Sequence, residues 1–306
     1  MQVSVYLLLL LASGLAALAP RLPARFAPAR AAKILTGLAA ASAACTIWGL
    51  GLLGLTLIAT TPMAAETGVD ADPVPAALAV VATGLLAAGL GRAVLTAARR
   101  RSIQRAMREV CAMCADHGEL AVVSDDTPQA FAVPGRARGL RGPGQPGRIL
   151  VSTGLLRAAT PAERRVVLAH ERAHLHYRHH RHQAIVDLAA AINPLLAKTK
   201  YATVFLLERW ADEAAASVTN DRQGTARALA TVALASRTAT SSRATLAFHH
   251  HGVLERVRAL QVPAPSQQPR LAYLLIIPTG LSILTASDAT LALARLLHPL
   301  LSHLAG

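Results

Sequence analysis

Residues 170–174 read His-Glu-Arg-Ala-His, and their types and spacing suit metal-assisted hydrolysis. Residues four apart share one face of a helix, so His170 and His174 are expected to point toward one position. Two imidazoles at that spacing can hold a zinc ion. Glu171, beside the first of them, can accept a proton from an attacking water molecule. The segment therefore predicts a zinc site that hydrolyses peptide bonds.

The residues before this motif predict the helix that positions it. Thr160 can serve as the N-cap, Pro161 as the first helical residue, and Glu163 as the partner that completes a capping box. The apolar residues 166–169 then lead into the motif and predict that this part of the helix is buried. The alternative is a solvated helix with two unrelated histidines. A buried helix that delivers two histidines and a glutamate inward is hard to explain as a surface feature.

A hydrolytic zinc ion needs a third protein ligand and an open fourth position. Glu208 and Asp212 lie four residues apart in a segment that follows the apolar stretch 201–207, so they share a helix face. Glu208 is the candidate third ligand, and Asp212 can accept a hydrogen bond from the far nitrogen of a ligating histidine. The alternative is an exposed acidic face. The chain has only 17 acidic residues, and this pair sits in an apolar helix, which favours the metal site.

These two motifs, H-E-x-x-H and then E-x-x-A-D, resemble those of the membrane gluzincins. That family includes the heat-shock membrane proteases, the CAAX prenyl proteases and the peptidase domain of the beta-lactam-sensing regulators. The resemblance covers roughly residues 100 to 262 and is most specific at the zinc motifs. It implies a zinc endopeptidase in which His170, His174 and Glu208 hold Zn²⁺ and Glu171 is the general base.

Weaker resemblances lie outside the zinc motifs. Residues 127–135 and 148–156 look like two neighbouring strands of that family, with Gln129 in place of its usual asparagine. Residues 192–195 look like the turn before the glutamate helix of the beta-lactam-sensor type, and residues 254–260 look like its closing segment. The Arg-, Gly- and Pro-rich residues 135–147 predict a loop between the two strands.

The composition predicts a membrane protein. Hydrophobic residues make up 53% of the 306 residues, and the mean hydropathy is +0.39. Four stretches approach the roughly 20 apolar residues that a membrane-spanning helix needs: Val3–Ala19, Ile34–Thr60, Val74–Ala97 and Leu271–Leu296. The first could instead be a signal peptide, because residues 17–19 resemble a cleavage site. No charged segment precedes it, so we expect it to be retained.

The distribution of basic residues predicts the topology. The loop between the first two spans carries three arginines and Lys33, and five arginines follow the third span, whereas residues 61–72 carry no lysine or arginine. Basic residues stay in the cytoplasm, so the N-terminus is expected outside and the peptidase domain inside. Arg92 is expected to reach out of the third span toward the cytoplasmic surface.

The net charge of +14 has the same explanation. Much of the excess borders the predicted spans, and the rest, such as Arg164, Arg165, Arg178 and Arg181, is expected to face anionic lipid or an acidic partner. Aromatic residues are only 3% of the chain, so platforms for stacking bases are scarce and no nucleic-acid partner is expected.

Other histidines receive no catalytic role. Residues 176, 179, 180 and 182 are all histidine and are expected to be mostly solvated or near lipid headgroups. His249, His250 and His251 form a run that we read as an exposed loop, although one of them, or Arg256, could stabilise an oxyanion.

The predicted fold is mainly α and membrane-bound. It combines about four transmembrane helices with an α+β zincin-like cytoplasmic domain that contains a small sheet, whose edge can receive an extended peptide. The predicted divisions are residues 1–98 with three spans, 99–268 with the metallopeptidase domain, and 269–306 with the fourth span and a short tail. Residues 183–196 are apolar but too few for a span, and Asn193-Pro194 interrupts them, so they predict a core helix or one that dips into the membrane.

The function expected from these features is an integral-membrane zinc metalloendopeptidase. Its substrate is expected to be a cytoplasmic or membrane-adjacent protein, with a transcriptional repressor in a signalling relay as one candidate. No S-x-x-K element follows the last predicted span, so beta-lactam sensing is not expected. The alternatives are membrane-protein quality control and a catalytically silent, metal-binding scaffold. A transporter or channel needs paired polar residues within several spans, and the first three offer almost none.

Overall fold

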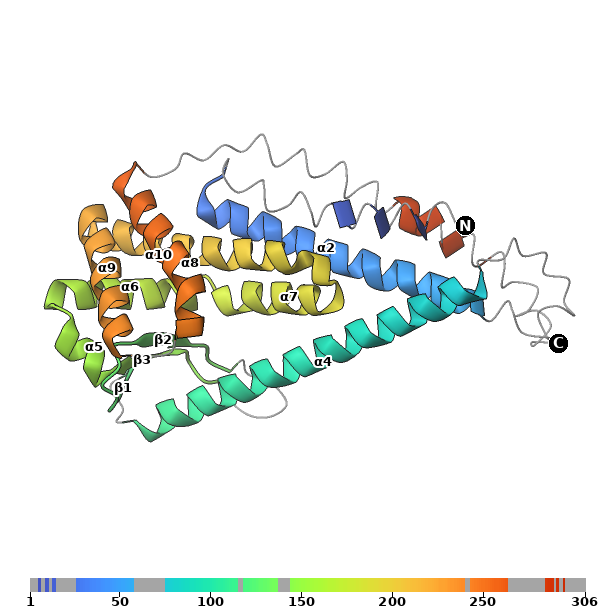
Figure 1. The fold of residues 1–306 in the computed structure, drawn as a ribbon. Coiled ribbons are helices and arrows are strands. Elements are labelled where there is room, and N and C mark those ends of the chain that lie inside the picture. The colour runs from blue at the N-terminus through green and yellow to red at the C-terminus, as the bar shows by residue number, and fades with distance from the viewer. Residues whose placement is uncertain are drawn as a thin grey trace, which may run out of the picture.

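The structure is a computed structural model that describes residues 5–6, 9–10, 13–14, 26–57, 75–114, 118–136, 144–239, 243–263, 284–288, 290–291 and 294. Its elements are α2 (Pro28–Leu55), α4 (Ala76–Met113), β1 (Leu120–Val123), β2 (Ala130–Val133), β3 (Arg148–Ser152), α5 (Thr153–Ala158), α6 (Pro161–His176), α7 (His179–Ile192), the short 3₁₀ helix η4 (Pro194–Leu196), α8 (Ala197–Thr219), α9 (Arg222–Ala239) and α10 (Arg243–Gln261). Helices dominate and enclose one small sheet (Figure 1). The prediction of a mainly helical fold with a small sheet is therefore confirmed.

Among the described residues, two helices, α2 and α4, are long and apolar enough to cross a membrane. They correspond to the second and third predicted spans. The first and fourth predicted spans, Val3–Ala19 and Leu271–Leu296, fall largely outside the described residues, so a total of four spans stays a prediction. Helix α4 continues past the predicted domain boundary at residue 98 without a break, because the arginine-rich segment that follows is also a good helix former.

The two long helices converge at one end and diverge at the other (Figure 1). Where they converge, Leu53 and Ala82 pack in one cluster, and a Cβ atom at Gly54 would lie only 2.8 Å from Thr83 Oγ1. Where they diverge, α7 and α8 occupy the space between them, and the first half of α2 packs against α8 through Leu35 and Leu207. The zinc-motif region therefore rests directly on the first long helix.

The sheet has three strands in the order β1-β3-β2. Strand β2 pairs antiparallel with β3, with Phe131 opposite Leu150, which confirms the two strands predicted near 127–135 and 148–156. Strand β1 pairs parallel with β3 and was not predicted. Ile149 and Val151 of β3 pack against the apolar side of α6. Among the described strands, β2 forms the edge of the sheet that lies closest to the histidine motif.

Helix α6 begins with the predicted capping box. The Thr160 hydroxyl accepts a hydrogen bond from the Glu163 backbone N–H at 3.3 Å, and the Glu163 carboxylate accepts one from the Thr160 N–H at 2.8 Å. Pro161 occupies the first turn. These contacts fix where the helix starts, and therefore which face carries the histidine motif.

Thr160→Ala is expected to lower the free energy of unfolding by about 1 kcal/mol, because the N-terminal amides of α6 lose their acceptor. Thr160→Ser keeps a hydroxyl and should stay near the wild-type value. Thermal unfolding of the detergent-solubilised chain, followed by circular dichroism, measures the difference. Equal midpoints for the alanine and wild-type chains would show that this cap contributes nothing.

Candidate metal centre

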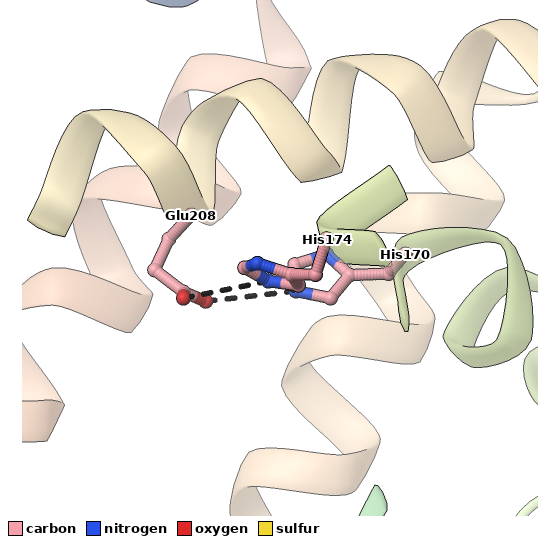
Figure 2. A group of neighbouring side chains, drawn as sticks. All are labelled: His170, His174 and Glu208. Carbon is pink, nitrogen blue, oxygen red and sulfur yellow. Dashed lines mark hydrogen bonds and ion pairs between the residues drawn. The ribbon is translucent and has the colours of Figure 1, made fainter. Parts of the chain in front are cut away.

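Helices α6 and α8 bring the three predicted ligands together (Figure 2). The Nε2 atoms of His170 and His174 lie 3.0 Å apart. His170 Nε2 lies 3.5 Å from one carboxylate oxygen of Glu208, and His174 Nε2 lies 3.5 Å from the other. One ligand atom from each of the three residues falls within 4.8 Å of the others. Two segments that are separate in the sequence therefore converge on one position.

The spacing of these atoms fits a tetrahedral zinc ion. Ligand atoms about 2.1 Å from a tetrahedral ion lie about 3.4 Å from one another. The two imidazole nitrogens lie 3.0 Å apart, and each lies 3.5 Å from a different oxygen of the Glu208 carboxylate, which is close to that value. Two imidazoles and one carboxylate are also a donor set found at catalytic zinc sites, which leave a fourth position open. His170, His174 and Glu208 could thus hold zinc without rearrangement of the helices.

Asp212, one turn after Glu208 on α8, lies where the sequence predicted a supporting carboxylate. Its Oδ1 is 3.0 Å from His170 Nδ1. When Nδ1 donates its hydrogen to this carboxylate, the lone pair of His170 Nε2 is left free for a metal. Asp212 itself is buried, so its charge needs a partner.

That partner is Arg256 on α10. Its Nε and one terminal nitrogen each donate to Asp212 at 2.7 Å, and the other terminal nitrogen lies 3.1 Å from Glu208. A planar guanidinium can hold two carboxylates in this way because its donors form a fixed fork. The sequence suggested Arg256 only as an oxyanion group, and no local pattern indicated that it would pair with residues more than 40 positions earlier.

The buried charges shift one another's pKa values. Burial lowers the pKa of His170, but its hydrogen bonds to Asp212 and Glu208 outweigh this and raise the pKa to about 10. Burial alone would raise the pKa of Glu208 and Asp212, yet contacts with His170 and Arg256 hold both below their usual values. Burial lowers the pKa of His174 to about 4. At neutral pH, therefore, both carboxylates are ionised and His174 is neutral, whereas His170 carries a proton that a bound metal ion would displace.

Glu171 lines a cavity of ≈ 310 Å³ together with both histidines, Glu208 and β2 residues that include Ala132. Burial raises the pKa of Glu171 to about 7, against the opposing effects of charged His170 and of a hydrogen bond from the Ala132 backbone. A carboxyl group with a pKa near neutrality can take up a proton and release it within one reaction cycle. The position and environment of Glu171 therefore suit a general base.

His179, the first residue of α7, supports the second histidine. Its Nδ1 lies 2.9 Å from His174 Nδ1, and its side chain is packed against Trp210 at 4.7 Å between ring centroids. The expectation of a solvated histidine run is wrong for His179, which is 1% exposed. Burial, and then the nearby His174, lower its pKa to about 3, so its ring is neutral, and its Nδ1 can accept the hydrogen that His174 Nδ1 carries when Nε2 binds a metal.

The turn before His179 places the side chain of His179 next to His174. Arg178 adopts the left-handed backbone conformation with φ = 54°, which costs about 1–2 kcal/mol for a residue other than glycine. This turn swings α7 away from α6 while it places the His179 ring against His174. The sequence carries no signal that separates His179 from its neighbouring histidines.

His179→Phe is expected to lower zinc affinity about 10- to 100-fold, because the aromatic packing remains while the acceptor for His174 Nδ1–H is lost. Competition with a fluorescent chelator measures the affinity. His176→Phe is the matched control, because His176 is an exposed histidine on α6. The assignment fails if both variants bind zinc equally well.

Arg256→Met is expected to lower the free energy of unfolding by about 3–5 kcal/mol, because Asp212 and Glu208 are left as buried charges without their cation. Urea unfolding in detergent gives the value. Arg258→Met, two residues along the same helix and exposed, should change it little. A small effect at Arg256 would mean that water reaches these carboxylates.

Comparison with known proteins adds one finding. Residues 95–206 match the family model described as "Peptidase family M48", a family of zincin-like metallopeptidases. No curated protein and no solved structure matches the chain. The matched segment contains the whole of α6 and ends just before Glu208. The family match and the geometry support a metallopeptidase from different residues, since Glu208 lies outside the matched segment.

Proposed function

We propose that the chain is an integral-membrane zinc metalloendopeptidase. The observation that carries the proposal is the convergence of His170, His174 and Glu208 at tetrahedral spacing, with Glu171 in the same cavity. The match of residues 95–206 to peptidase family M48 supports the same reaction class. A silent metal-binding scaffold would not need a buried glutamate in the cavity with a pKa raised toward 7.

Each side chain has a role in peptide hydrolysis. A bound zinc ion would polarise the scissile carbonyl and make a water molecule more acidic. Asp212 and His179 orient the two imidazoles through their Nδ1 atoms. Glu171 accepts a proton from the attacking water and delivers it to the leaving amine. Burial of the site strengthens these interactions, because few water molecules remain to screen them.

The edge strand β2 offers a place for the substrate backbone. Residues Ala130, Phe131 and Ala132 line the cavity that contains Glu171 and both histidines. An extended polypeptide can add to a sheet edge through backbone hydrogen bonds, which are independent of its sequence. This arrangement supports cleavage within an extended segment of a protein, so we assign an endopeptidase.

The charge distribution supports a cytoplasmic site. The Arg-rich part of α4, which follows its apolar part, leads directly into the sheet beside the candidate metal centre. Basic residues next to spans remain in the cytoplasm. The substrate proposed here is accordingly a cytoplasmic or membrane-adjacent protein. Its assignment as a repressor in a signalling relay rests only on the resemblance to the beta-lactam-sensing regulators.

Glu171→Gln is expected to retain zinc but to lower turnover about 10²- to 10⁴-fold, because the amide cannot accept the proton. Cleavage of fluorescent casein by the full chain in detergent measures turnover, and elemental analysis measures zinc. Glu255→Gln, an exposed glutamate on α10, is the control.

Two further results bear on the same proposal. A chelator should abolish wild-type cleavage, and added zinc should restore it. If the Glu171→Gln chain cleaves casein as fast as the wild type, the general base is misassigned. If the purified wild-type chain contains no metal and binds none, the metallopeptidase itself is excluded.

A further inference from the structure

A helical hairpin projects from the candidate metal centre toward the middle of the two long helices. Helix α7 leads away from the site, η4 reverses the chain, and α8 returns and carries Glu208 (Figure 1). We call residues 192–201 the hairpin tip. Its turn is tied to α2, because the Asn193 side-chain amide donates to Thr46 Oγ1 at 3.1 Å. The Asn193 side-chain oxygen also accepts from the Leu195 N–H at 3.0 Å.

The contacts of the hairpin tip set its depth along the candidate spans. Thr46 lies nine residues before the end of α2, which corresponds to about 14 Å of helix. On α4, a Cβ atom at Gly89 would lie 3.0 Å from the Ile192 carbonyl oxygen, and Gly89 lies about 20 Å from the start of that helix. The hydrocarbon core of a bilayer is about 30 Å thick. The tip is therefore level with the apolar middle of both helices.

The packing of the hairpin suits an environment without water. Ala39 and Ala43 of α2 form one cluster with Val186, Ala189 and Leu196. Small residues of this kind allow helices to approach closely within lipid. Two backbone carbonyls at the end of α7 also have hydrogen-bond partners, as lipid requires.

Two hydrogen bonds pair these carbonyls. Arg92 Nε donates to the Ala191 carbonyl at 2.9 Å, and the Asn193 N–H donates to the Ala189 carbonyl at the same distance. Arg92, which is exposed, thus also caps the end of α7, and its reach toward the cytoplasmic surface stays a prediction.

The outer face of the tip is apolar and exposed. Leu195 is 62% exposed and Tyr201 is 54% exposed. Helix α4 also carries exposed apolar side chains, such as Val94 and Leu90. Lys198 is also exposed near the tip, and its long stem allows the ammonium group to reach the headgroups.

An ion cluster marks the level at which the hairpin leaves the apolar zone. Asp187 of α7 pairs with Arg100 of α4 and, at 2.9 Å, with Lys200 of α8. Arg100 lies 24 residues after Ala76, or about 36 Å along α4, which is beyond the hydrocarbon core. Asn193 lies six residues past Asp187, so the turn sits about 9 Å deeper than this cluster.

We propose that the hairpin tip is re-entrant: residues 192–199 insert about 10 Å into the hydrocarbon of the bilayer, where lipid acyl chains cover Leu195, and Lys200 and Tyr201 lie at the level of the headgroups. The proposal rests on the membrane placement of α2 and α4 given under the proposed function. It has a consequence for the substrate. Glu208 lies eight residues after Lys200, or about 12 Å of helix, so the site cleaves polypeptide segments next to the membrane surface.

The test uses the full chain in nanodiscs, with Cys45, Cys111 and Cys114 replaced by alanine. An environment-sensitive fluorophore is attached at Leu195→Cys, Val80→Cys or Val218→Cys. Val80 is exposed on α4, and Val218 is 75% exposed at the far end of α8. Quenching by lipids with a nitroxide on the acyl chain is compared with quenching by aqueous iodide.

Leu195 is expected to behave like Val80, with acyl-chain quenching about twofold or more above that at Val218, because both side chains lie in hydrocarbon. The proposal is overturned if Leu195 behaves like Val218 while Val80 is quenched by lipid. If Val80 is also quenched by iodide, the membrane placement itself is wrong and the hairpin proposal falls with it. Neither result alters the zinc and casein assays, so failure of the peptidase assignment is seen separately.

A second measurement avoids the cysteine replacements. A photoreactive benzoylphenylalanine at position 195, in the chain with its native cysteines, should crosslink to lipid and give a lipid-sized mass increase. The same group at position 218 should not. Absence of lipid adducts at 195, with adducts present at position 80, would reject insertion of the tip.

Discussion

The candidate metal centre depends on how two buried carboxylates are neutralised. Glu208 and Asp212 project from one face of α8: Glu208 is half-buried and lines the cavity, and Asp212 is buried, where an unpaired charge costs several kcal/mol. Arg256 from α10 and the imidazole of His170 from α6 supply the compensation at 2.7–3.1 Å. Three helices are thus held together by the same contacts that orient a ligand. A substitution that removes one of these contacts is therefore expected to affect both the folding of this region and the geometry of the metal centre.

The two histidines are supported in different ways, and the difference controls the charge of the site. Asp212 holds His170 and makes its ring more basic, whereas neutral His179 holds His174 without adding charge. A second supporting carboxylate would place another negative charge beside Glu208 and raise the pKa of Glu171 further. With His179 in that place, two carboxylates and one guanidinium surround the ligand atoms. A divalent cation then leaves a modest net charge, which suits a site that must also admit a polar peptide backbone.

The sequence predicted those parts of the site that depend on local spacing. Residues four apart share a helix face, so the spacing alone pairs His170 with His174 and Glu208 with Asp212. The capping box at Thr160 follows from side-chain chemistry. Arg256 and His179 could not be assigned in this way, because their partners are set by how α10 and α7 pack and not by periodicity. Strand β1 was missed because four residues carry too little alternation to distinguish a strand. The division at residue 98 followed a change in charge, but a change in charge does not end a helix when its residues still favour one.

Helix α8 connects the metal centre to the proposed membrane surface. Its first turns carry Lys200, which pairs with Asp187, and its middle carries Glu208, with no proline or glycine between them. An uninterrupted helix keeps two of its residues at a fixed distance far better than a loop does, because its backbone hydrogen bonds resist bending. The same helix presents Trp210 to Lys33 of α2 at 5.1 Å and to His179 at 4.7 Å, so α2 also abuts the support of the second histidine. In the proposed orientation, rigid helices on two sides therefore set the height of the candidate metal centre above the bilayer, and the proposed substrate segment would be cut at that height.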